Sequence, residues 1–247
     1  MLFRSQLAVL VETMRREGFE LAVSRPEVIM RKDETTGETL EPAEEVVVDV
    51  DEEFSGIVVQ KITERRGELR EMVPSGGGKQ RLVFVAPARG LIGYHGEFLT
   101  DTRGTGIMNR LFHSWIPHKG KITGRRNGAL ISIAPGPAMA YAMFNLEDRG
   151  KMLVQSGVDT YAGMIIGEHS RENDLEVNVQ KAKQLTNFRA AGKEEAVKLV
   201  TIPPITLEWA MTWINDDELV EVTPKNIRLR KTYLDPNERK KMEKKAV

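Results

Sequence analysis

The stretch that decides the fold reads Glu45-Val-Val-Val-Asp-Val-Asp-Glu-Glu-Phe-Ser-Gly-Ile-Val-Val-Gln-Lys-Ile62. Its first part alternates apolar and polar or exposed positions, with valines at every second residue from Val46 to Val50, which is typical of a strand with one buried face. Its second part repeats apolar residues at helical spacing from Phe54 to Ile62. Asp51 stands between them and could cap the helix, with two glutamates in the first turn to favour the helix dipole. A strand followed directly by a helix is therefore predicted.

Outward from this stretch, the pattern continues with two strands, a helix and a last strand. The strands are predicted at Glu68–Val73 and Arg81–Ala86, joined by a Pro-Ser-Gly-Gly-Gly turn, the helix at about Leu91–Thr100, and the last strand at about Thr105–Ile116. The order strand, helix, strand, strand, helix, strand is that of the ferredoxin-like fold, an antiparallel sheet with helices on one face. We expect an α+β chain, with a ferredoxin-like domain at residues 45–118 followed by a strand-rich α+β domain.

The flanking segments divide the rest of the chain. Residues 1–30 read as a helix and a strand, which either pack on the rest of the chain or are the remnant of an upstream domain, and residues 31–44 read as an acidic linker. Residues 119–247 form the predicted C-terminal domain, in which residues 169–193 are polar and weakly periodic and are expected to be a mobile basic loop.

Composition excludes several classes of protein. The sequence contains no cysteine, so disulfides, thiolate nucleophiles and cysteine-ligated metals are excluded. No apolar run approaches the roughly 18 residues that a membrane span needs. No signal peptide is recognisable. We therefore expect a cytoplasmic protein that does not enter a membrane.

The net charge is zero, but the two signs are separated along the chain. Residues 33–53 carry acidic residues and no basic one, whereas residues 102–146 carry basic residues and no acidic one. Val179–Lys193, called here the basic segment, also lacks acids. Separated charge suits a protein that docks one face on a polyanion, because phosphate contacts supply most of the affinity for nucleic acid. The alternative is that these charged stretches are solvent-exposed surfaces that contact other parts of the same chain.

Twelve residues are candidates for RNA contact, as donors to phosphate or as a base-stacking aromatic in a basic loop. They are Arg89, His95, Arg103, Arg110, Lys119, Arg125, Arg126, Lys181, Lys183, Phe188, Arg189 and Lys193. Two of them belong to the motif Arg89-Gly-Leu-Ile-Gly-Tyr-His-Gly96. Its glycines allow close approach of another backbone, which could be RNA or the protein's own chain. Trp209 and Trp213, at helical spacing, are interpreted as core.

Catalytic motifs are weak. Ser75-Gly-Gly-Gly-Lys79-Gln80 resembles a phosphate loop, but it lacks the earlier glycine and the magnesium-binding hydroxyl, and a strand follows it instead of a helix. A hairpin turn is the better interpretation. The histidines lack the spacing of a metal site. We expect no catalytic centre, no metal and no cofactor. Acid–base catalysis at His169 ranks last among the hypotheses, after a protein-interaction module that uses the acidic residues 33–53.

Several long motifs resemble the BipA/TypA family of ribosome-binding translational GTPases. Glu12–Ile29 resembles the end of the family's third domain. The motifs that resemble its elongation-factor-G-like fifth domain are Gly67–Pro74, Arg89–Tyr94 and Thr102–Gly106, and those that resemble its C-terminal domain are Gly124–Ser132, the run continuing through Asp148-Arg-Gly150, and Asp217–Lys225. Met1–Gln6 departs from the Gly-Arg-Gly-Glu-Leu-His run that opens this helix in the family.

The resemblance implies a function. The family consists of GTP-dependent factors that bind the bacterial ribosome near the A site and serve ribosome assembly and adaptation of translation to stress. GTP and magnesium are expected only in an N-terminal domain upstream of the sequence considered. By the same resemblance, the fifth domain faces ribosomal RNA and the loop at residues 169–193 reaches toward the acceptor end of a tRNA.

Overall fold

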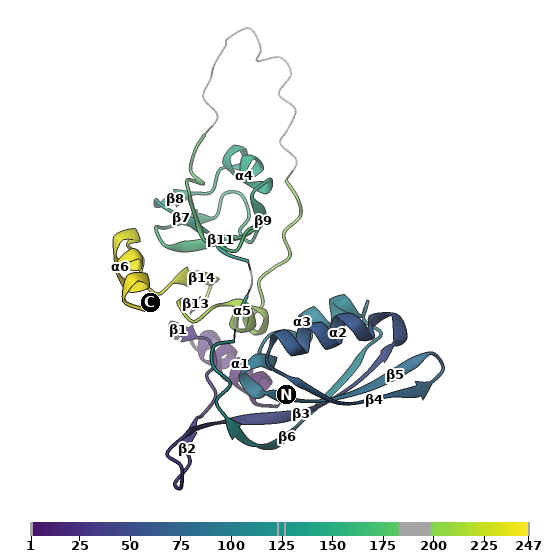
Figure 1. Ribbon diagram of the computed structural model, residues 1–247. Helices are drawn as coiled ribbons and strands as arrows, with labels where there is room; N and C mark the ends of the chain where they lie inside the picture. Colours follow the sequence, from purple (N-terminus) through teal and green to yellow (C-terminus); the bar gives the residue numbers. More distant parts are fainter. Residues whose placement is uncertain (1, 123, 126, 183–198, 247) are drawn as a thin grey trace. The chain divides into compact units, whose positions relative to one another are not determined.

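The computed structural model describes residues 2–122, 124–125, 127–182 and 199–246, and the chain divides into two compact units (Figure 1). The first unit comprises residues 26–124. The second combines residues 2–25 with residues 125–247. Both units contain helices packed on sheets, so the chain is α+β as predicted.

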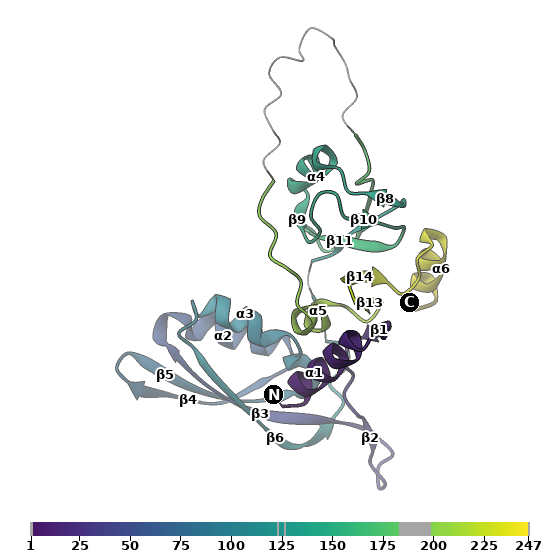
Figure 2. The same cartoon turned by 180° about the vertical axis from the view of Figure 1, so that it is seen from behind.

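The first unit is an antiparallel sheet with its two α-helices on one face (Figures 1 and 2). Its elements are β2 (Arg31–Lys32), β3 (Thr39–Asp51), α2 (Glu52–Glu64), β4 (Glu68–Gly76), β5 (Lys79–Pro87), the 3-10 helix η1 (Ala88–Leu91), α3 (Tyr94–Asp101) and β6 (Ile107–Pro117). The strands lie in the order β4-β5-β3-β6, and β2 pairs with the start of β3. Long β3 is therefore the centre of the sheet, hydrogen-bonded on both sides.

The valines of the deciding stretch form the centre of this unit's core. Val46, Val48 and Val50 are fully buried and pack with Val58 and Ile62 of α2. Alternation puts the three valines on one face of β3, and helical spacing turns the α2 residues toward them. Helix α2 therefore begins where the sequence changes from alternating apolar residues to apolar residues at helical spacing.

Asp51 has a different role from the one expected. It is the N-cap residue of α2 by position, but its side chain makes no capping hydrogen bond. Instead its carboxylate accepts a hydrogen bond from the Thr105 hydroxyl at 2.8 Å, which fixes the turn that precedes β6.

The second helical stretch is broken into two pieces, η1 and α3. Gly93 separates them with a φ of +80°, a conformation that favours glycine. Gly90 serves close packing: a Cβ added there would lie 2.7 Å from the carbonyl oxygen of Arg65. At Gly90 the structure therefore supports the interpretation in which the motif approaches the protein's own backbone. Gly96 has open space around it.

The glycine turn before Lys79 is a hairpin between β4 and β5. Gly76, Gly77 and Gly78 all have positive φ, and Gly76 pairs with Lys79 across the turn. No helix follows it, which agrees with the rejection of a phosphate loop.

The acidic linker predicted at residues 31–44 is wrong. Residues 31–32 and 39–44 are strands, joined by a tight turn in which Asp33 accepts the backbone N–H groups of Thr35 and Thr36. The acid-rich composition concealed a strand because Glu41, at its centre, is fully buried and neutralised by an ion pair with Arg89.

The second unit is built on a larger sheet with the strand order β1-β13-β14-β11-β7-β12, and β9 pairs with β11. The strands of the second unit are β1 (Leu21–Ser24), β7 (Ala129–Ser132), β8 (Gly136–Pro137), β9 (Gly150–Met152), β10 (Asp159–Thr160), β11 (Met164–His169), β12 (Leu175–Val177), β13 (Glu218–Val222) and β14 (Ile227–Lys231). Of these, β8 and β10 pair with each other outside the larger sheet. The helices of the unit are α1 (Leu2–Arg16), α4 (Ala140–Glu147), α5 (Leu207–Trp213) and α6 (Pro236–Ala246). Strand β9 pairs antiparallel with β11, with Met152 opposite Gly167.

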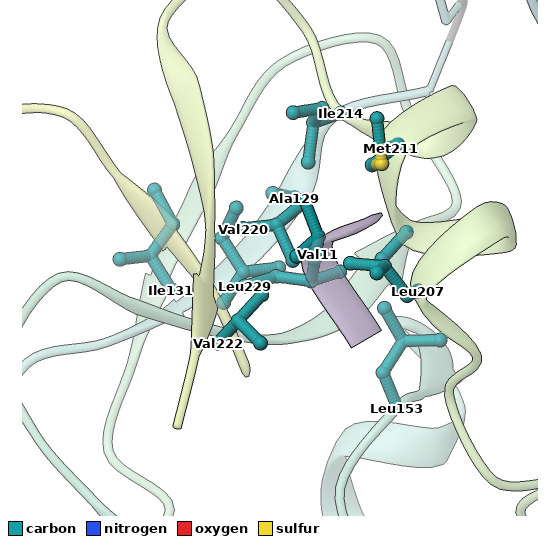
Figure 3. Close-up of a cluster of buried hydrophobic side chains, with 12 residues drawn as sticks. Val11, Ala129, Ile131, Leu153, Leu207, Met211, Ile214, Val220, Val222 and Leu229 are labelled. Carbon is teal, nitrogen blue, oxygen red and sulfur yellow. The ribbon is translucent and has the colours of Figure 1, made fainter. Parts of the chain in front are cut away.

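Both faces of this sheet are covered. Ile165 contributes to one cluster, with α1 and α5, which Figure 3 shows, whereas its neighbours Met164 and Ile166 contribute to a second cluster with Met143 of α4. Successive side chains of a strand point to opposite faces, so β11 must be apolar at consecutive positions to fill both clusters. This explains why Met164, Ile165 and Ile166 are consecutive apolar residues.

The N-terminal helix and strand, predicted as residues 1–30, pack within the second unit. Leu21–Ser24 pair antiparallel with Leu219–Val222, and Val11 of α1 lies in the same apolar cluster as α5. Of the two alternatives left by the sequence, packing on the rest of this chain is the one observed. Their origin as the remnant of an upstream domain stays a prediction.

The mobile loop predicted at residues 169–193 is wrong for the part that the structure describes. His169 ends β11 and is 4% exposed, and Leu175–Val177 form β12, which pairs parallel with β7. Residues 183–193 lie outside the described residues. The charged C-terminal tail contains helix α6.

We predict that Gly90→Ala destabilises the protein by about 1–3 kcal/mol, because its Cβ would press on the Arg65 carbonyl and force the backbone to move. Gly96→Ala is the matched control from the same motif, since its Cβ meets open space within a helix, where alanine is favoured. Urea unfolding measures both. Equal stability of the two variants would contradict the packing role of Gly90.

Candidate nucleic-acid interface

The basic segment leaves the second unit from a buried polar anchor. The side-chain amide of Gln180 donates hydrogen bonds to Thr160 Oγ1 at 2.6 Å, to the Ala134 carbonyl at 2.7 Å and to Ser132 Oγ at 3.2 Å. Ser132 and Thr160 are both buried. The Gln180 Oε1 atom is buried without a partner, so the hold on this side chain comes from its amide N–H groups alone. Breaking these contacts would leave further desolvated groups unpaired. Gln180 thus fixes the point from which Lys181 enters solvent.

The chain returns to the opposite end of helix α4. Val179, next to the Gln180 anchor, accepts a hydrogen bond from the backbone N–H of Met139, the N-cap residue of α4. On the return, the N–H of Val200 donates to Glu147 Oε1, in the last residue of α4, at 3.0 Å. The chain is therefore tied to one end of α4 at Val179, where the basic segment begins, and to the other end at Val200, beyond that segment.

Two exposed aromatic side chains lie on α4 between these anchors. Tyr141 is 38% exposed and Phe144 is 50% exposed. Residues three apart are neighbours on a helix surface, so the two rings belong to one face. Aromatic rings beside basic side chains are the combination that stacks on bases and contacts phosphates. The sequence analysis missed both residues, although the spacing of the two aromatics in a short helix was a visible signal.

Arg89 is engaged within the first unit. Its guanidinium forms a bidentate ion pair with Glu41 and also donates to the Gly120 carbonyl. Burial by itself would raise the pKa of the Glu41 carboxyl, but the hydrogen bonds from Arg89 and from the Lys119 backbone N–H hold that pKa below its usual value. Arg89 is therefore the counter-ion of a buried carboxylate.

Three further candidates also have acidic partners. Arg110 pairs with Glu44 at 3.4 Å, and Lys119 pairs with Glu68. Arg125 makes a bidentate pair with Glu218 at 2.9 and 3.0 Å, and its guanidinium lies 3.6 Å from the ring centroid of Trp213. Trp213 packs against the apolar cluster, as expected of a core residue. Trp209 stacks on Trp213 but is exposed, so its interpretation as a core residue is wrong. RNA contact by these cations stays a prediction.

Three candidates are exposed within the described residues: His95, Arg103 and Lys181. Arg103 has a left-handed φ of +49° and lies over the ring of Phe54. Arg126, Lys183, Phe188, Arg189 and Lys193 lie outside the described residues. Of the seven candidates that the structure describes, four are therefore internally paired and three are exposed.

Neither a metal site nor a membrane span is found where the structure can be described. Those residues contain no group of three or more metal-ligating side chains. None of their helices is both long and apolar enough to cross a bilayer.

Comparisons with known proteins divide the chain as the fold does. Residues 38–126 match the family described as elongation factor G C-terminus, and residues 127–236 match the TypA/BipA C-terminal domain. The large ribosomal subunit assembly factor BipA of Escherichia coli K12 is 52% identical over 238 residues, which cover 95% of this chain and 39% of that protein.

Two further relatives carry the same name. The protein of Haemophilus influenzae is 50% identical over 236 residues, which cover 95% of this chain and 38% of the relative. That of Bacillus subtilis strain 168 is 48% identical over 240 residues, with 97% and 39% covered. The chain thus spans less than two fifths of the length of these relatives.

We predict that Arg89→Met lowers the free energy of unfolding by about 3–5 kcal/mol at pH 7, because it leaves the Glu41 carboxylate buried without its counter-ion. Because the folded-state pKa of Glu41 is depressed, the ion pair stabilises the fold at neutral pH and this stabilisation is lost as pH falls through that pKa. The difference between variant and parent in urea unfolding should shrink accordingly. Arg103→Met, at an exposed cation, should change stability little. A pH-independent loss in Arg89→Met would contradict the buried-pair argument.

Proposed function

Because the chain belongs to the TypA/BipA family and carries its C-terminal region, we propose that it binds ribosomal RNA and takes part in assembly of the large ribosomal subunit. The relatives are named as assembly factors of that subunit, and RNA is its main polyanion. The A-site region, the acceptor end of a tRNA and a role in stress adaptation are finer parts of the same proposal, and they rest on the family resemblance.

The observation that carries the proposal is that the chain is held at both ends of α4, by Val179 at the start of the basic segment and by Val200 beyond it. The segment has four basic residues and no acid between Val179 and Lys193. Gln180 holds the chain near the start of this segment, and Glu147 holds it beyond the end of the segment. Tyr141 lies on α4, between the two ends of that helix. A segment rich in positive charge gains contacts to phosphate, while the neighbouring aromatic face can receive bases.

The first unit supports the fold assignment within this proposal. Its antiparallel order β4-β5-β3-β6, with α2 and α3 on one face, is the arrangement expected of a ferredoxin-like domain at residues 45–118. Among the candidates for RNA contact in this unit, Arg103 and His95 are the two that are exposed.

The rival hypothesis, an acidic docking surface at residues 33–53, is less well supported. Glu41, Glu44 and Asp49 each pair with an arginine of the same unit. A basic partner would have to compete with these internal ion pairs. Catalysis by His169 is also disfavoured, because that ring is buried and its Nδ1 lies 2.5 Å from the Asn173 carbonyl oxygen.

We predict that replacing Lys181, Lys183, Arg189 and Lys193 with alanine weakens ribosome binding and reduces its salt dependence. Each lost phosphate contact should remove about 0.7–0.9 from the slope of log K against log salt. Co-sedimentation with ribosomes across a salt series measures this, and a thermal melt checks the fold.

The matched control is the alanine replacement of Lys225, Lys240, Lys241 and Lys244, which removes the same charge from exposed positions elsewhere in the unit. If both quadruple variants lose binding equally, net charge and not the basic segment is responsible. A parent-like salt slope in the basic-segment variant would remove the segment from the interface.

We also predict that this chain does not bind or hydrolyse GTP, because its sequence lacks a phosphate loop and the Gly76–Gly78 turn is a hairpin. Titration with a fluorescent GTP analogue in the presence of magnesium should show no saturable signal. Saturable binding that Lys79→Ala abolishes would mean that the hairpin is a nucleotide site.

A further inference from the structure

A hollow of about 340 Å³ lies in the second unit, where three segments meet. Its polar lining consists of Asp148, Arg149, His169, Ser170, Arg171 and Asn173. The first two follow the end of α4, His169 ends β11, and the last three belong to the turn that leads to β12. The proposed RNA interface accounts for none of these six side chains.

Backbone pairing brings the two arginines to this hollow. His169 pairs with Gly150 across β9 and β11, and the N–H of Ser170 donates to the Arg149 carbonyl at 2.9 Å. A side chain at position 150 would overlap the Glu168 carbonyl oxygen, so glycine permits this close approach. Arg149 and Arg171 are thereby placed on neighbouring, firmly paired segments.

The lining is cationic. Neither Arg149 nor Arg171 has an ion pair with any of the residues that the structure describes, and one carboxylate, that of Asp148, shares the hollow with two guanidinium groups. Guanidinium groups bind phosphate oxygens in a bidentate manner and stay charged at all relevant pH values. An anion with several oxygens therefore suits the hollow better than a metal ion.

His169 adds a polar group with a defined orientation. Its ring is nearly fully buried, and because a carbonyl oxygen can only accept, Nδ1 carries the proton that it donates to Asn173. The Nε2 atom of His169 takes no part in the hydrogen bond to Asn173. The Ser170 hydroxyl supplies a further donor in the lining.

We propose that this hollow is a phosphate-binding site, with Arg149 and Arg171 as the principal ligands. Its place in the fold favours a phosphate of RNA as the source. Asp148 directly follows Glu147, which holds the chain at Val200 after the basic segment, so an RNA strand lying along α4 would meet the hollow at the helix end. The site extends the proposed RNA binding but depends on its own lining, and a small anion can test it without RNA.

The test is an NMR titration of the full chain with inorganic phosphate, at constant ionic strength set with chloride, following the Arg Nε–Hε signals and the His169 ring. Saturable shifts are expected, with the association constant lowered about tenfold in Arg149→Gln and in Arg171→Gln, a loss of about 1.4 kcal/mol each. Lys151→Gln is the matched control, because Lys151 is an exposed cation two residues from Arg149 that does not line the hollow.

Absence of saturation, or an equal loss in Lys151→Gln, would overturn the site, since both would indicate nonspecific attraction. A second arm compares a 5′-phosphorylated RNA tetranucleotide with a mononucleotide. Tighter binding of the tetranucleotide that requires both arginines supports RNA as the source, and tighter binding of the mononucleotide overturns that source. If phosphate binds while ribosome binding fails, the hollow stands and the proposed function falls. The reverse result rejects the hollow alone.

Discussion

The second unit depends on a buried carboxylate, that of Glu218. The Glu218 carboxylate accepts hydrogen bonds from the Arg125 guanidinium at 2.9 Å, from the Lys231 ammonium of β14 at 2.9 Å and from the backbone N–H of Asn215 at 2.9 Å. Lys231 also contacts Asp217 and Asp174. Burial alone would lower the pKa of its ammonium, but these carboxylates raise that pKa above its usual range.

This network ties together segments that are distant in the sequence. Asp174, while contacting Lys231, also accepts the N–H of Ala129 at 2.7 Å and so holds the start of β7 beside the turn that leads to β12. That turn forms one wall of the cationic hollow, and β12 leads to the Gln180 anchor. A buried ion cluster with its hydrogen bonds satisfied specifies one arrangement, because separating any partner leaves a desolvated charge. The positions of both proposed RNA contacts thus depend on it.

The separated charges of the sequence have a largely internal explanation in the first unit. Several of the acidic residues, Glu41, Glu44 and Asp49 among them, lie on β3 and pair with arginines of neighbouring elements. Asp49 faces Arg81 directly across the β3–β5 pair, and Glu44 pairs with Arg110 of β6. Opposite charges on neighbouring strands stabilise a sheet. A stretch of like charges in the sequence can therefore indicate an ion-pair partner within the protein as well as a partner outside it. Only the structure shows which described cationic side chains have no acidic partner.

Local sequence patterns were enough to predict the order of strands and helices in residues 45–118, because the change from alternation to helical spacing after Val50 leaves one way to bury both apolar faces. The break of the second helix into η1 and α3 was not predicted. The sequence by itself also determined that the glycine turn before Lys79 is no phosphate loop, since the required residues are missing. It could not reveal that Glu41 is a strand residue, because only its tertiary partner Arg89 makes burial of that charge tolerable. Nor could it place α1 on the second unit, gather Arg149 with Arg171, or set Tyr141 between the anchors. Those relations join residues through long-range pairing and packing, which local patterns of hydrophobicity and charge do not encode.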